Sequence, residues 1–137
     1  ISIYGKAFQE LKELGIIDKV PRLLGVNVEG AKTFSVLVNE KGLKWNNGDF
    51  DANIIKDYYH ELDSKGVKPK TVASAIAILK PENLTKALRA LEYTNGRVVS
   101  VSDDRVLWWQ HVVATNGFSC EPASAATVAG IEEALRV

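Results

Sequence analysis

The residues best suited to chemistry lie near the carboxyl end of the chain, at positions 120–130. Glu121 and Pro122 are followed by a run made almost entirely of Ala, Ser, Thr and Gly. A carboxylate that ends a strand, next to a proline that opens a helix, would lie where open α/β sheets bind ligands. The small residues at 123–125 would either leave room for a ligand ring or let the helix pack tightly on the sheet without any ligand.

Other reactive side chains give weaker signals. His60 and His111 fall on predicted helices with no further His or Cys at ligand spacing, so no metal site is predicted. Cys120 has no base nearby in the sequence, which favours a buried strand cysteine over a nucleophile. The sequence contains neither a dinucleotide nor a nucleotide phosphate fingerprint.

Composition narrows the class of protein. The chain has 137 residues, 17 Lys+Arg against 17 Asp+Glu, one Cys and no Met. This length fits one domain, and a net charge of zero gives no field that would attract nucleic acid. A single Cys excludes an internal disulfide, and neither a membrane span nor a signal peptide is visible. A chain without Met that opens on Ile1-Ser2-Ile3 is interpreted as a piece of a longer protein.

Hydrophobic spacing predicts the elements that must position these residues. Helices are expected at 3–14, 50–66, 81–95, 102–116 and from 122 onward, and buried strands at 23–28, 98–101 and 118–120. Residues 32–38 fit a helix or a strand, and the state of 71–79 is left undecided. The alternation predicts an α/β fold with a mostly parallel sheet flanked by helices. Residues 39–66 are predicted to be a peripheral insertion that contributes no strand to the sheet.

Several blocks of the sequence also carry a family resemblance. They are 8–18 with Pro21-Arg22, 28–31, 71–76, 86–91 with Asn95-Gly96, 101–103 and, most specifically, Glu121-Pro122-Ala123-Ser124-Ala125-Ala126-Thr127-Val128-Ala129-Gly130. In this order they resemble the threonine synthases, which are pyridoxal-phosphate enzymes of fold type II. The resemblance implies that residues 1–137 are part of the large, cofactor-binding domain. Residues 33–68 depart from the family pattern.

The resemblance implies an activity as well. Threonine synthases are lyases of amino-acid biosynthesis that convert O-phospho-L-homoserine and water to L-threonine and phosphate. A cytoplasmic enzyme with a small-molecule substrate, and without a nucleic-acid or membrane partner, is therefore expected; a homo-oligomer is compatible with it. The Schiff-base lysine is expected upstream, so no catalytic residue is assigned and the 137 residues alone are expected to be inactive.

The resemblance also implies a set of residues near pyridoxal 5′-phosphate. Ser2 would begin a helix whose amino-terminal end faces the cofactor phosphate, and the turn at 29–31 would line the cofactor. Glu121 and Ser124 would lie near the pyridine ring, with Ala125 leaving room for it. The full set is Ser2, Glu29, Gly30, Ala31, Ala75, Glu121 and Ser124.

Two alternatives remain open. The chain could belong to another fold type II enzyme, of the cysteate synthase, threonine dehydratase or cysteine synthase type, because one scaffold serves several reactions. It could instead be a non-catalytic interaction module if the natural gene also ends here. The gene sequence upstream, with or without a lysine motif, distinguishes an enzyme from such a module.

Overall fold

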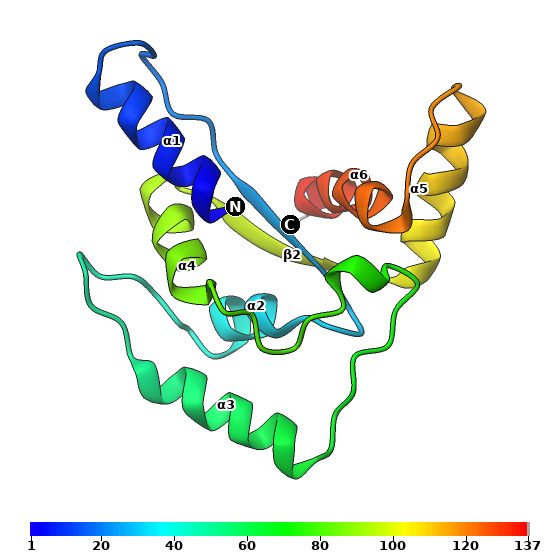
Figure 1. Cartoon of the computed structure of the whole chain (residues 1–137), viewed down its shortest axis with the longest axis horizontal. Coiled ribbons are helices and arrows are strands. Elements are labelled where there is room, and N and C mark those ends of the chain that lie inside the picture. The colour runs from blue at the N-terminus through cyan, green and yellow to red at the C-terminus, as the bar shows by residue number, and fades with distance from the viewer. Residues whose placement is uncertain (137) are drawn as a thin grey trace.

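A sheet of two parallel strands forms the centre of the structure, a computed structural model that describes residues 1–136. Strand β1 (Leu24–Val28) pairs along its whole length with β2 (Arg97–Val101). Helices surround the strands, as Figure 1 shows. They are α1 (Ser2–Glu13), α2 (Thr33–Ser35), α3 (Ala52–Ser64), α4 (Leu84–Tyr93), α5 (Asp103–Thr115) and α6 (Pro122–Arg136), with a π-helical turn η1 (Val36–Glu40) and a 3₁₀ turn η2 (Ser74–Ile76). The predicted α/β class with parallel strands is confirmed.

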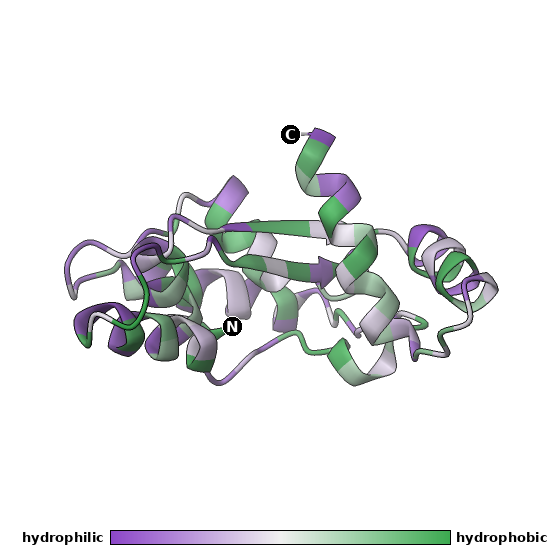
Figure 2. Ribbon diagram, turned by 90° about the horizontal axis from the view of Figure 1, so that it is seen from above, coloured by the Kyte–Doolittle hydropathy of each residue, from purple (hydrophilic) through white to green (hydrophobic). Residues whose placement is uncertain are grey.

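The sheet separates two hydrophobic cores. On one face, Val28 and Val101 pack with α5 and with the small residues of α6. On the other face, Val98 packs with Phe34, Leu37 and the apolar side of α4. Both faces of the strands are therefore covered, which is why their sequences are rich in valine rather than alternating with polar residues. In Figure 2, both strands are largely green with some purple and pale segments, and the helices alternate green with purple.

Helix α6 approaches the sheet unusually closely. Ala125, Ala126 and Ala129 are almost completely buried in the core that α6 shares with β1. A Cβ atom added to Gly130 would lie 2.3 Å from Cγ2 of Val26, so any larger residue there would overlap β1. Tight helix–sheet packing therefore accounts for this part of the small-residue run, and Ala125 lies in the core instead of leaving room for a ring.

Most predicted helices are confirmed, with shifted ends. Ser102 caps α5 as expected, since its hydroxyl accepts a hydrogen bond from the Arg105 backbone N–H at 3.3 Å. Helix α4 begins at Leu84, three residues after the proline at 81, because residues 82–83 form a turn before it. Residues 32–38 prove mainly helical, and 71–79 form an irregular segment around η2.

The strand predicted at 118–120 is wrong. These residues have irregular structure, and Phe118 is exposed. A strand needs a neighbour for its backbone hydrogen bonds, and within residues 1–136 the sheet consists of β1 and β2 only. The carbonyl of Cys120 instead accepts a hydrogen bond at 2.8 Å from the Gln110 side chain on α5. Cys120 is half-buried against the core but does not lie on a strand.

Residues 39–66 lie to one side of the sheet and contain no strand of it. Trp45 stacks on Phe50 at a centroid distance of 5.7 Å, which folds the loop back on itself. Helix α3 then packs one face, Ile54, Ile55 and Tyr58, against the core beside α4. Whether the segment is an insertion relative to relatives stays a prediction. None of the helices in the described part of the chain is long and apolar enough to cross a membrane.

Candidate functional site

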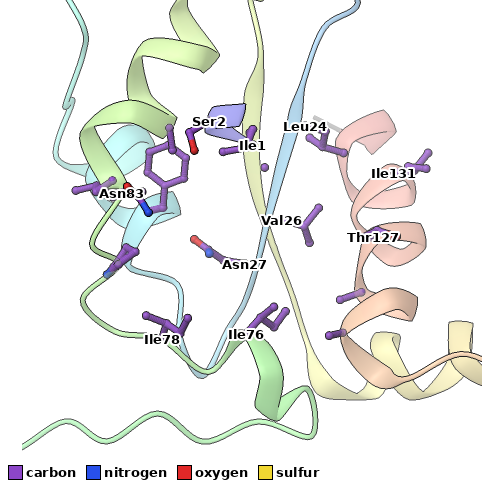
Figure 3. A pocket seen from close by; sticks show the side chains of 17 residues that line it. Ile1, Ser2, Leu24, Val26, Asn27, Ile76, Ile78, Asn83, Thr127 and Ile131 are labelled. Carbon is purple, nitrogen blue, oxygen red and sulfur yellow. The ribbon is translucent and has the colours of Figure 1, made fainter. Parts of the chain in front are cut away.

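A cavity of about 590 Å³ runs along β1. Figure 3 shows its walls: β1 at the back, the starts of α1 and α4 on one side, and α6 on the other. Its lining is mostly apolar and includes no charged side chain. The lining residues are Ile1, Ser2, Leu24, Gly25, Val26, Asn27, Phe34, Ile76, Ile78, Pro81, Asn83, Leu84, Ala87, Ala123, Ala126, Thr127 and Ile131.

Three helices begin at the wall of this cavity. Ser2 opens α1, Asn83 precedes α4, and Ala123 lies in the first turn of α6. Neither α1 nor α4 receives a side-chain hydrogen bond at its amino-terminal cap. The first N–H groups of a helix have no partner within the helix, and here they receive none from a cap side chain, while the helix dipoles make this end electropositive. Such an end favours an anionic group of a ligand.

Asn27 is a polar side chain on the strand wall of the cavity. Its Oδ1 accepts a hydrogen bond from the Ser35 backbone N–H at 2.9 Å. Asn39, on η1, supports the same region by donating to Ser35 Oγ at 3.2 Å and to the Val98 carbonyl at 3.0 Å. The Asn27 side chain is thus anchored through its oxygen while it borders the cavity.

The loop between α3 and α4 forms the rim at the carboxyl end of β1. Before η2, Asp103 accepts hydrogen bonds from the Thr71 hydroxyl at 2.5 Å and from the Val72 N–H at 3.1 Å. After η2, the Thr33 hydroxyl donates to the Leu79 carbonyl at 2.6 Å. Because the loop is tied down on both sides of η2, the side chains of 76 and 78 are held as an apolar edge of the cavity.

Ser2 alone among the predicted cofactor-binding residues lines the cavity. Glu29, Gly30 and Ala31 follow β1 directly, at the carboxyl end of the sheet, but lie outside the cavity wall. The Glu29 N–H continues the ladder to the Val101 carbonyl at 2.9 Å. Ala31 is buried, and a Cβ on Gly30 would lie 1.8 Å from the carbonyl oxygen of Lys70, so the turn needs glycine for close packing.

The remaining predicted site residues are exposed and also lie outside the wall. Glu121 and Ser124 begin α6, and Ala75 lies on η2. Glu121 follows an irregular segment rather than the strand that was expected before it. The roles predicted for these side chains stay predictions.

Sequence reasoning missed the polar residues other than Ser2 that line the cavity. Asn27 interrupts a strand of Val, Leu and Gly, and Asn83 stands just before an amphipathic helix. A lone polar residue inside a buried strand must find hydrogen-bond partners. This was the signal that could have pointed to Asn27.

A second cavity, of about 680 Å³, lies in the groove between α1 and α4. It shares Ser2 and Asn83 with the first cavity, and its charged lining residues are Lys6, Lys86 and Arg89. No carboxylate lines it. The starts of α1 and α4 are therefore electropositive on their outer side as well.

Glu132 joins α5 to α6. Its carboxylate accepts hydrogen bonds from Arg105 and, at 2.7 Å, from the Trp109 ring N–H. These two donors, with the nearby Arg136, hold the pKa of Glu132 below its ordinary value of about 4.5. Arg105 also lies over the exposed Trp108 ring, 4.4 Å from its centroid. This cluster fixes α6, and with it the α6 wall of the cavity.

The structure offers no donor set for a metal in the part of the chain that it describes: His, Cys, Asp and Glu do not gather there in groups of three or more. His60 on α3 and His111 on α5 are both exposed.

The sequence was compared with known proteins. No protein-family model matches the chain. The chain is 33% identical over 136 residues to the threonine synthase of Mycobacterium tuberculosis, covering 98% of this chain and 31% of that protein. It is 35% identical over 129 residues to that of Methanosarcina acetivorans, covering 93% and 27%, and 32% identical over 136 residues to that of Methanocaldococcus jannaschii, covering 98% and 29%.

The chain spans less than a third of the length of these curated relatives, whereas the matches extend over nearly all of the chain itself. They include residues 33–68, for which the sequence blocks gave no alignment. Over nearly its whole length, the chain is therefore similar in sequence to one segment of these threonine synthases.

Proposed function

We propose that the chain supplies part of the cofactor and substrate site of a pyridoxal-phosphate-dependent threonine synthase of fold type II, a cytoplasmic enzyme. The reaction would convert O-phospho-L-homoserine and water to L-threonine and phosphate. The observation that carries the proposal is the set of matches to threonine synthases, at 32–35% identity over 93–98% of the chain in the three relatives above.

The cavity beside β1 fits such a cofactor. Its volume of about 590 Å³ lies within the range of roughly 300–1,000 Å³ found for small-molecule sites. Apolar walls suit an aromatic ring, and the uncapped start of α1 suits a phosphate. The polar groups of the lining are few and neutral, which matches a site that orients a ligand by hydrogen bonds.

Pyridoxal phosphate, when bound, supplies an electron sink that allows protons to move at the carbons beside the substrate amine. In this proposal Ser2 and the first amides of α1 bind the phosphate. Ile76 and Ile78 cover the ring from the loop and exclude water. The turn at 29–31 and Ala75 approach the cofactor from the carboxyl end of β1, and Glu121 and Ser124 approach it from the start of α6.

Proton transfer needs a lysine that the cavity does not contain. None of the lysines among residues 1–136 lines it. The proposal therefore places the cofactor-holding lysine in a part of the natural protein outside this chain, and gives this chain the work of binding and orientation.

The test uses the natural protein that contains this chain. The purified protein should bind pyridoxal phosphate, with its visible absorbance, and release phosphate and threonine from O-phospho-L-homoserine. Ser2→Asp should weaken cofactor binding because it adds a negative charge beside the phosphate. An acidic residue in the first helical turn favours the helix itself, so α1 should stay folded. Ala52→Asp adds the same charge at the start of α3, away from the cavity, and serves as the matched control.

Two outcomes would refute the proposal. Cofactor binding with turnover of another amino acid, but not of O-phospho-L-homoserine, would indicate a different fold type II enzyme. If the protein does not bind the cofactor at all, the chain is better explained as part of a non-catalytic interaction module.

A further inference from the structure

We propose that Asn27 is a specificity-determining residue, whose side-chain N–H donates a hydrogen bond to an anionic oxygen of the ligand in the β1 cavity. The anionic oxygen belongs to a phosphate or a carboxylate. The inference rests on the proposed function for the choice of ligand, and on the structure for the choice of residue.

The orientation of the Asn27 amide is determined by its neighbour. The Ser35 backbone N–H is a donor, so the atom of Asn27 that faces it at 2.9 Å must be the oxygen. The side-chain nitrogen is then the other branch of the planar amide, and it points away from the Ser35 N–H. Figure 3 shows this side chain projecting from β1 toward the side of the cavity where Asn83 and the start of α4 lie.

The nitrogen has no protein partner. Among the described residues, no hydrogen bond from Asn27 Nδ2 is found, although Asn39 Nδ2 makes two in the same region. Nor is Asn27 Nδ2 among the polar atoms that are fully buried without a partner, so the cavity reaches it. The amide oxygen already accepts a hydrogen bond, whereas the nitrogen is free to donate one. Such an amide can bind a hydrogen-bond acceptor of a ligand without rearrangement.

The support around Asn27 is rigid. Ser35 is buried, and its hydroxyl accepts a hydrogen bond from Asn39 on the π-helical turn η1. Asn39 also donates to the Val98 carbonyl on β2, which ties this turn to the sheet. Single π-helical turns are frequent at functional sites, and here the turn supports the residue that supports Asn27.

The electrostatics favour an anion as the acceptor. The lining carries no charged side chain, so no carboxylate repels an anion and no Lys or Arg neutralises one. The uncapped starts of α1 and α4 make one wall electropositive. Hydrogen bonds to charged groups are also stronger than those between neutral groups. The Asn27 N–H therefore discriminates between ligands with and without an anionic oxygen at this point.

The substitution Asn27→Asp distinguishes the role of the side-chain oxygen from that of the side-chain nitrogen. An aspartate oxygen can still accept from the Ser35 N–H, so the internal contact is kept. The group that faces the cavity changes from a donor to a negative charge. Asn53→Asp, in the first turn of α3 and outside the cavity, is the control for charge alone.

Binding is measured on the natural protein that contains the chain, with pyridoxal 5′-phosphate, pyridoxal and O-phospho-L-homoserine as probes. If the partner is the cofactor phosphate, Asn27→Asp should weaken pyridoxal 5′-phosphate binding by roughly ten- to a hundredfold and leave pyridoxal binding unchanged. If the partner is an anionic group of the substrate, KM for O-phospho-L-homoserine should rise by a similar factor while cofactor affinity holds. Asn53→Asp should change neither quantity.

A second measurement needs no substitution. The side-chain NH₂ signals of Asn27 in a ¹H–¹⁵N spectrum should shift when inorganic phosphate or pyridoxal 5′-phosphate is added. If these signals do not move and Asn27→Asp lowers only the unfolding midpoint, Asn27 is structural and the inference is overturned. If the signals move but O-phospho-L-homoserine is not turned over, the Asn27 site stands and the proposed function fails.

Discussion

Replacing Gly130 by alanine tests how closely α6 packs on the sheet. The new Cβ would lie 2.3 Å from Val26 Cγ2 and 3.0 Å from its Cγ1, whereas ordinary contact begins at 3.4 Å. Helix and strand would have to separate by about 1 Å, because a valine side chain has little freedom about χ1. All the small residues that α6 buries against β1 would lose contact together.

The magnitude is the difference of two opposing effects. Overpacking a close-packed core costs about 1–3 kcal/mol. Alanine is better than glycine inside a helix by about 0.8–1.0 kcal/mol. Since the clash involves a stiff side chain on the central strand, overpacking should dominate. We expect Gly130→Ala to lower the free energy of unfolding by about 1–2 kcal/mol.

A double-mutant cycle checks the cause as well as the sign. Val26→Ala removes the obstructing methyl groups, so Gly130→Ala in that background should stabilise the protein, by up to about 1 kcal/mol. The free energies would be measured by urea unfolding followed by circular dichroism, with Thr127→Ala as a control for helix propensity on the exposed side of α6. If Gly130→Ala is equally destabilising with and without Val26, the contact with β1 is not its cause, and the packing argument is refuted.

Three further predictions concern the caps, the charges and the lysines. Ser102→Ala should destabilise the protein by about 1 kcal/mol in urea unfolding, since it removes the acceptor for the first turn of α5; an unchanged midpoint would show that the cap contributes nothing. The pKa of Glu132 is lowered in the folded protein, so its contribution to stability is present above about pH 4.5 and is lost as pH falls through the folded pKa. Unfolding midpoints measured from pH 6 to pH 3 should therefore fall less steeply for Glu132→Gln than for the unmodified protein, and parallel curves would contradict this. Finally, the 137 residues alone, incubated with pyridoxal phosphate and reduced with borohydride, should show scattered, low labelling of lysines by mass spectrometry; stoichiometric labelling of one lysine would place a cofactor lysine in this chain.

Local patterns in the sequence predicted the elements that depend on local interactions. Spacing of apolar residues located α1, α3 and α5, and Ser102 marked the start of α5 correctly. The segment at 118–120 has strand-like composition, yet it is irregular because strand formation depends on a partner that composition does not report. The π-helical turn at 36–40 was also not predicted, and its Asn39 makes long-range contacts that local spacing does not report, such as the one with Val98.

The candidate site was predicted less well than the fold. Ser2, assigned to the site through the family resemblance, lines the cavity, and its role toward a cofactor stays a prediction. Asn27 and Asn83 were missed, since only the tertiary arrangement brings a strand residue and a helix start to one cavity. The sequence left open whether the small residues of α6 make room for a ligand or allow tight packing on the sheet. The burial of Ala125 and Gly130 shows that these two positions serve packing.

The attachment of α3 has a consequence for local unfolding. This helix packs through one face onto the core beside η1, and its contacts at the surface include ion pairs such as Lys41 with Glu61 and Lys80 with Asp63. Exposed ion pairs contribute little, so α3 can detach at a smaller free-energy cost than the sheet. Its amide hydrogens should exchange with solvent through such local opening, well before those of β1 and β2, which are released only when the central structure unfolds. Helix α3 would then behave as a separate cooperative unit, able to change conformation while the strands and the cavity beside them stay intact.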